Sequence, residues 1–204
     1  MVDQATLGTI GALAREANAR VFVGEIYLDA LFERAPPSAF HLGPEFIVTN
    51  SLTKVYGLSG LRCGWILAEP ELARKFWRLN DLVANIPAHA AERLSCIALE
   101  NLDQISRRAR ALLDTNHVLF NRFLAEREDL EAPTFGSGTI SFPYLKRGNV
   151  EQLSHLLREK YQTSVVPGRF FGMPDHIRIG LGCETEFFAE GIQRLGTALN
   201  EVGR

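Results

Sequence analysis

The stretch SLTKVYGLSGLRCG, residues 51–64, decides how the rest of this sequence is interpreted. It places Lys54 and Arg62 among glycines and small hydroxyl side chains, between the apolar runs EFIVTNS (45–51) and CGWILAE (63–69). Both runs have the length and the β-branched and aromatic content of short strands. Lys54 is therefore expected in a turn directly after a buried strand, where nearby glycines let a ligand approach the backbone.

Lys54 and Arg62 together suggest a ligand that carries an aldehyde and an anionic group. Most lysines are solvated surface charges, and this is the ordinary interpretation of Lys54 taken alone. A lysine in a mostly desolvated pocket loses proton affinity and becomes a usable amine nucleophile, as Schiff-base chemistry requires. Arg62 offers a fixed fork of donors for a phosphate, and Ser51 adds a hydroxyl. The glycines match neither the dinucleotide fingerprint nor the nucleotide phosphate loop.

The residues before this stretch predict the beginning of an α/β sheet. Residues near 4–18 have helical spacing, and Asp3 is available to cap the helix. The run RVFVGEIY (20–27) predicts another buried strand. Alternation of helix and apolar strand is typical of a sheet whose strands are covered on both faces.

The residues after it predict a second, smaller lobe. The pattern from Pro70 to about Glu128 is helical, and short strands are then expected in GTISFPYL, SVVPG and HIRIGLG. Asn149 and Gln152 form a capping arrangement for a helix to about Tyr161, and another helix is expected at the end. This mixture indicates an α+β domain. We place the boundary near residue 103, which gives domains 1–102 and 103–204.

Composition narrows the classes of function. The chain has 204 residues, of which 46% are hydrophobic and 23% charged, as in ordinary globular proteins. A net charge of -2 gives no electrostatic footprint for nucleic acid. Three cysteines without a CxxC pair argue against a disulfide framework and a zinc site. We find no signal peptide or membrane-spanning run, so a cytoplasmic protein with no membrane partner is expected.

Residues 51–64 resemble the lysine segment of the class I/II aminotransferases, the fold type I enzymes that depend on pyridoxal phosphate. Relative to Lys54, the matching positions are a serine three before, a small residue one before, a glycine three after, an arginine eight after and a glycine ten after. The runs VFVGEIYLD, SVVPGRFFG and HIRIGLG resemble, in the same order, further segments of that family. The resemblance extends over effectively the whole chain.

The resemblance implies a role for each matching residue. Lys54 would form the Schiff base with pyridoxal 5'-phosphate and carry the α-proton, while Ser51 and Arg62 would hold the cofactor phosphate. Tyr27 would hydrogen-bond the phenolic oxygen of the cofactor. Arg178 would bind the α-carboxylate of the substrate, and the protein would be a homodimer that transfers an amino group between an α-amino acid and a 2-oxo acid.

Two features that the family has are absent here. Gly24 stands where the family has the aspartate that keeps the pyridine nitrogen protonated, and the adjacent Glu25 should point to the opposite face of its strand. Family members also begin far upstream, so the sequence resembles only the C-terminal part of the large-domain sheet together with the small domain. Strands without their sheet neighbours would expose edges and apolar faces, which favours association.

Three alternatives remain open. The parent enzyme could be a lyase, racemase, decarboxylase or synthase, because the same cofactor and scaffold serve all of these. The chain could instead be a non-catalytic module that binds pyridoxal phosphate or an amino acid, which the loss of the aspartate at Gly24 favours. It could also be a truncated, inactive piece of the parent protein.

Overall fold

The computed structural model describes residues 2–83, 86–133 and 136–203. They form two compact units, Met1–Arg107 (unit 1) and Arg108–Arg204 (unit 2). The division falls inside helix α4 (Leu102–Ala125), a few residues after the boundary expected between residues 102 and 103. The assignment of domains 1–102 and 103–204 to a large and a small domain stays a prediction.

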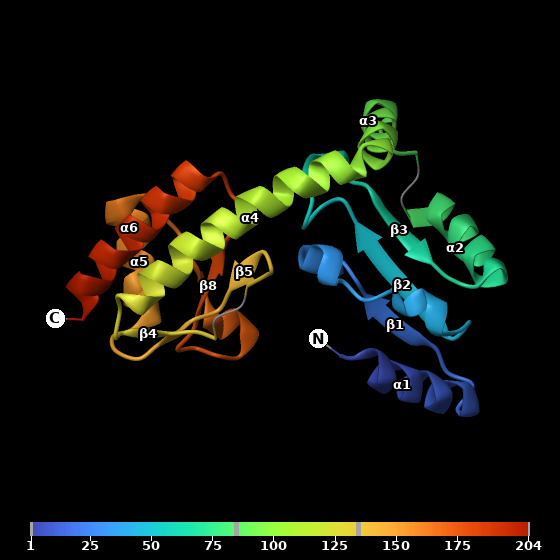
Figure 1. Cartoon of the computed structure of the whole chain (residues 1–204), viewed down its shortest axis with the longest axis horizontal. Coiled ribbons are helices and arrows are strands. Elements are labelled where there is room, and N and C mark those ends of the chain that lie inside the picture. The colour runs from blue at the N-terminus through green and yellow to red at the C-terminus, as the bar shows by residue number, and fades with distance from the viewer. Residues whose placement is uncertain (1, 84–85, 134–135, 204) are drawn as a thin grey trace. The chain divides into compact units, whose positions relative to one another are not determined.

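Unit 1 is built on a three-stranded sheet in the order β1 (Val21–Gly24), β2 (Phe46–Ser51), β3 (Gly64–Leu67). Strand β2 lies between the other two, parallel to β1 and antiparallel to β3 (Figure 1). The helices of this unit are α1 (Gln4–Glu16), α2 (Pro70–Val83), α3 (His89–Glu100) and the first part of α4. The side chain of Asp3 accepts a hydrogen bond from the Thr6 amide, so the predicted helix and its cap are confirmed.

Strand β1 is shorter than the sequence predicts because the chain turns at Glu25. The Glu25 amide still donates to the Thr49 carbonyl at 2.8 Å, but the Glu25 carbonyl already accepts from the Leu28 amide at 2.8 Å. A 3-10 helix, η1 (Leu28–Arg34), follows directly. The carboxyl end of β1 therefore lies at Gly24 and not at Tyr27.

The described residues cover one face of this sheet, as expected for strands without their sheet neighbours, and not both faces as the alternation of helix and strand alone predicts. On one face, Phe46 and Val48 are 1% and 0% exposed. They pack against Ala39, which begins the short helix η2 (Ala39–Leu42), and against Leu7 of α1. On the other face, Phe22 of β1 is 69% exposed and Ile66 of β3 is 48% exposed. The described residues therefore cover one face of the sheet and leave apolar side chains on the other in contact with solvent.

Unit 2 contains antiparallel strands backed by helices. Strands β5 (Ile140–Ser141), β8 (Ile177–Gly180) and β7 (Val166–Pro167) form one sheet, and β4 (Leu130–Glu131) pairs with β6 (Tyr144–Leu145). Helices α5 (Val150–Tyr161) and α6 (Thr185–Val202) lie side by side (Figure 1). The Asn149 side chain accepts from the Glu151 and Gln152 amides, which confirms the predicted start of α5.

No described helix combines the length and the apolar character needed to cross a bilayer. Within the same residues, histidine, cysteine and carboxylate side chains form no group of three that suits a metal ion.

The backbone packs closely around Gly168, and this packing in unit 2 can be tested by mutation. A β-carbon there would lie 2.1 Å from the Met173 carbonyl oxygen and 2.6 Å from that of His176, whereas one at Gly180 would meet nothing within 4 Å. We expect Gly168→Ala to lower the free energy of unfolding by about 1–3 kcal/mol, as overpacking does. Gly180→Ala, the matched control, should change it little. Urea denaturation of both variants measures this, and equal effects would contradict the packing at Gly168.

Candidate functional site

The carboxyl ends of β1 and β2 gather most of the predicted site residues. These strands are parallel, so their carboxyl ends meet at one edge of the sheet, the place where α/β sheets bind ligands. Gly24 ends β1, and Tyr27 follows as the N-cap of η1. Ser51 ends β2, and Lys54 follows it in a turn. The fold thus brings Gly24, Tyr27, Ser51 and Lys54 to the same edge.

Lys54 lies on a loop, residues 52–63, that we call the lysine loop. The loop is closed where the Leu52 amide donates to the Cys63 carbonyl at 3.1 Å, and the Leu58 amide donates to the Leu52 carbonyl at 3.0 Å. Leu52, Val55 and Tyr56 are 0%, 4% and 7% exposed and belong to the core of unit 1. Lys54 is therefore held between buried residues, and its backbone position is fixed by apolar packing.

The amine of Lys54 differs from those of the other three lysines. Lys75, Lys146 and Lys160 form ion pairs with carboxylates at 3.0, 3.0 and 2.7 Å. Lys54 makes no hydrogen bond or ion pair with any described residue and is exposed. The described residues leave the side chain open to solvent, and a desolvated pocket around Lys54 stays a prediction. What they provide is an unpaired amine on a well-packed loop.

Arg62 sits at the other end of the lysine loop in an uncommon backbone conformation. Its φ and ψ are 52° and 32°, in the left-handed region that residues other than glycine seldom adopt. Such a conformation costs about 1 kcal/mol or more and persists where the surrounding packing holds it. The guanidinium donates only weakly, at 3.4 Å, to the Ser59 carbonyl, so its charge is unpaired among the described residues.

A polar network next to the lysine loop was not predicted from the sequence. The Asp29 carboxylate accepts a hydrogen bond from the Asn50 side chain at 2.9 Å, and the Asn50 side chain accepts from the Ser51 amide at 2.7 Å. Burial of Tyr56, together with the charge and hydrogen bonding of Asp29, raises the pKa of the tyrosine hydroxyl. The network ties η1, β2 and the lysine loop together. Its sequence signal was Asn50, a polar residue near the end of an apolar run.

Gly24 and Glu25 face opposite sides, as predicted from strand alternation. Gly24 is exposed, whereas Glu25 is 8% exposed and its carboxylate accepts a hydrogen bond from the Ala39 amide at 2.7 Å. Glu25 therefore has a structural partner on the covered side of the sheet. A β-carbon at Gly24 would meet only the Thr49 hydroxyl, at 4.0 Å, so packing does not require glycine there.

Arg178 belongs to unit 2. It lies in β8 between Ile177 and Ile179, which are 0% and 7% exposed, and it is itself partly exposed. No described residue forms a hydrogen bond or ion pair with its guanidinium. An arginine in apolar surroundings without an anionic partner suits a ligand carboxylate.

Asn116, which was not predicted from the sequence as a site residue, fixes the segment after β8. Asn116 of α4 is 0% exposed, and its side-chain amide donates to the Leu181 and Cys183 carbonyls at 2.8 and 2.9 Å. Its signal in the sequence was a polar residue on the apolar stripe that Leu113 and Phe120 mark on this helix. Asn116 thereby holds the chain that leaves the strand of Arg178.

A comparison with protein families identifies the chain. Residues 1–195 match the family described as aminotransferase class I and II. The chain belongs to this family. The predicted recognition is therefore confirmed, and members of the family depend on pyridoxal phosphate.

The individual relatives are distant and longer. Capreomycidine synthase of Streptomyces vinaceus is 28% identical over 157 residues, 76% of this chain and 40% of the relative. Aspartate aminotransferase of Streptomyces avermitilis is 26% identical over 209 residues, 95% of this chain and 51% of the relative. The chain thus spans about half the length of the curated relatives that it matches.

Solved aminotransferase structures confirm the predicted fold class. A pyridoxal-phosphate-dependent aminotransferase from Streptococcus suis superposes with a TM-score of 0.92 at 23% identity, covering 100% of this chain and 55% of the other. At this identity the likeness establishes the fold only. The chain has the α/β aminotransferase fold type I over part of a full-length member, and the roles of its site residues stay predictions.

Tyr56 allows the network beside the lysine loop to be tested by pH. Because its raised pKa favours the neutral hydroxyl in the folded state, Tyr56 stabilises the chain below about pH 10 and loses this contribution as pH rises further. In an alkaline titration followed by tyrosinate absorbance, Tyr56→Phe should remove a late step. Tyr161→Phe is the comparison variant, because a hydrogen bond to Glu201 also raises the pKa of Tyr161, and each variant should lower the late absorbance change. A late step of unchanged size in Tyr56→Phe would contradict the assignment.

Proposed function

We propose that this chain is part of a pyridoxal-phosphate-dependent aminotransferase that transfers an amino group between an α-amino acid and a 2-oxo acid. Lys54 carries the proposal, because it is the one lysine of four whose amine has no partner among the described residues. An unpaired amine on a packed loop is available to bond an aldehyde, whereas an ion-paired ammonium must first give up its carboxylate. Family membership supplies the chemical context.

The residues at the edge of unit 1 fit most of the cofactor. The Lys54 amine would bond its aldehyde, the Arg62 guanidinium and the Ser51 hydroxyl would hold its phosphate, and the Tyr27 hydroxyl would donate to its phenolic oxygen. Bound pyridoxal phosphate supplies an electron sink that makes loss of the substrate α-proton possible. Lys54, once released from the aldehyde, would take that proton on Nζ and return it elsewhere on the substrate.

Arg178 would bind the α-carboxylate of the substrate. Its guanidinium has no partner among the described residues and offers two parallel donors in the geometry of a carboxylate. We also propose that the parent protein is a cytoplasmic homodimer, as the resemblance to the family implies.

Reductive labelling tests the role of Lys54. When the chain is incubated with pyridoxal phosphate and reduced with borohydride, peptide mapping should find most of the phosphopyridoxyl group on Lys54. The ion-paired lysines Lys75, Lys146 and Lys160 should carry little of it. The expected preference is roughly fivefold, since an exposed ion pair contributes up to about 1 kcal/mol.

The matched control variants are Lys54→Ala and Lys75→Ala. The first should remove the labelled peptide and the absorbance of the bound cofactor, and the second should leave both unchanged. Label spread equally over the four lysines would contradict the proposal.

Gly24 supports a second candidate, a module that binds the cofactor or an amino acid without fast transamination. The pyridine nitrogen would lack its carboxylate, because Gly24 has no side chain and Glu25 is bonded to the Ala39 amide. Without that carboxylate the ring accepts electrons less readily, so proton loss would be slower while binding remains.

A substitution at Gly24 separates the two candidates. Since a β-carbon has room there, Gly24→Asp should fold and bind pyridoxal phosphate up to about fivefold tighter, the strength of an exposed ion pair. Gly24→Asn, which has the same shape without the charge, should not tighten binding. Equilibrium titration of the cofactor absorbance measures both. Equal affinities of the two variants would show that residue 24 does not face the pyridine nitrogen.

A further inference from the structure

The face of unit 2 that carries Arg178 also carries a cluster of rings. Strands β5 and β8 pair with Ile140 opposite Gly180 and Ser141 opposite Ile179, and the same register continues to a bridge between Tyr144 and His176. Phe142 therefore lies opposite Arg178. Residues opposite one another in antiparallel strands share a face, so Phe142, Tyr144, His176 and Arg178 point to the same side of the sheet.

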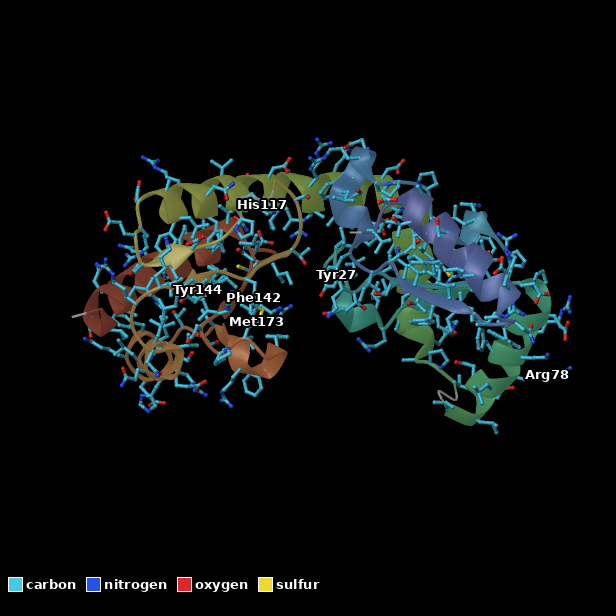
Figure 2. All side chains as sticks on the ribbon, turned by 90° about the horizontal axis from the view of Figure 1, so that it is seen from below. Tyr27, Arg78, His117, Phe142, Tyr144 and Met173 are labelled. Carbon is cyan, nitrogen blue, oxygen red and sulfur yellow. The ribbon has the colours of Figure 1, made fainter. Side chains whose placement is uncertain are left out.

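The rings on this side are in direct contact. Phe142 stacks on His176 with ring centroids 4.9 Å apart, Tyr144 lies 5.3 Å from His176, and Phe171 meets Phe142 edge to face at 5.5 Å. We call Phe142, Tyr144, Phe171 and His176 the aromatic face. Figure 2 shows Phe142 and Tyr144 close together in unit 2, with Met173 beside them.

The aromatic face is accessible, whereas the opposite side of the same strands is core. Tyr144 is 40% exposed and Phe171 is 51% exposed. Ile177 and Ile179, which alternate with Arg178 along β8, are 0% and 7% exposed on the other side. The Nδ1 atom of His176 is buried and has no hydrogen-bond partner in the described chain, so ring packing alone fixes the imidazole.

The charge of Arg178 and its distance from the rings indicate which kind of ligand the aromatic face can bind. Arg178 has no carboxylate partner among the described residues, and on the other side of β8 its neighbour in β7 is the apolar Val166. Phe142 lies opposite Arg178 across the two strands, and His176 lies two residues along β8, about 7 Å from Arg178. A carboxylate separated from a ring by two carbons spans a comparable distance. The ring would gain stacked or edge-to-face contacts that an alkyl group of similar size does not make.

We propose that Arg178 and the aromatic face together bind carboxylic acids that carry an aromatic ring, so that amino acids with ring side chains are the substrate class of this site. The inference rests on the proposed function, in which Arg178 binds the substrate α-carboxylate. It adds a preference that neither family membership nor Lys54 implies.

The preference is measured with acids that lack an amino group and so cannot react with an aldehyde. Calorimetric titration of the full chain should show 3-phenylpropionate binding about tenfold tighter than propionate, and tighter than 3-cyclohexylpropionate. Arg178→Gln should weaken 3-phenylpropionate binding at least about tenfold. Phe142→Leu should abolish the preference for the phenyl over the cyclohexyl acid.

The matched control is Arg122→Gln, which removes an exposed arginine paired with Glu126. It should leave binding of 3-phenylpropionate unchanged. Because no probe contains an amine, loss of cofactor labelling at Lys54 would contradict the proposed function and leave this result intact. Equal binding of 3-phenylpropionate and propionate, binding that survives Arg178→Gln, or no binding of either acid would each overturn the inference.

Discussion

The burial of Leu52, Val55 and Tyr56 is the constraint on which the candidate site depends. These three side chains of the lysine loop are packed in the core of unit 1. Each fully buried side chain of this size contributes about 1.5–3 kcal/mol to the stability of the fold. With these side chains in the core and the loop closed between Leu52 and Cys63, Lys54 and Arg62 have little freedom to move. The loop can therefore hold Arg62 in a left-handed conformation that its own side chain does not favour.

The packing at the carboxyl ends of β1 and β2 explains why Lys54 and Arg62 match the aminotransferase pattern while Gly24 does not. Lys54 and Arg62 sit on a loop whose neighbouring residues build the core, so folding fixes the backbone at both positions. Gly24 is exposed and touches little, so a change there has no structural cost. Glu25 cannot substitute because the strand ends there and its carboxylate holds the start of η2.

The sequence was sufficient for whatever depends on local pattern. The helix capped by Asp3, the strands on either side of the lysine loop and the helix starting after Asn149 follow from spacing, caps and apolar runs. The resemblance around Lys54 predicted the family. What depends on tertiary contacts was missed: the early end of β1, the Asp29 network and the buried Asn116. The cluster of rings around His176 follows from strand register, which a sequence pattern does not determine.

The central claim is that one packed loop presents both an amine for an aldehyde and a cation for a phosphate. It is tested most directly by comparing the affinities of pyridoxal phosphate and pyridoxal, which share the aldehyde and differ in the phosphate, for the unmodified chain and for Arg62→Gln. A charged hydrogen bond near the surface contributes about 1.5 kcal/mol, so the unmodified chain should prefer pyridoxal phosphate by at least about tenfold. Arg62→Gln should lose most of that preference while its binding of pyridoxal is unchanged. An undiminished preference in Arg62→Gln would contradict the account.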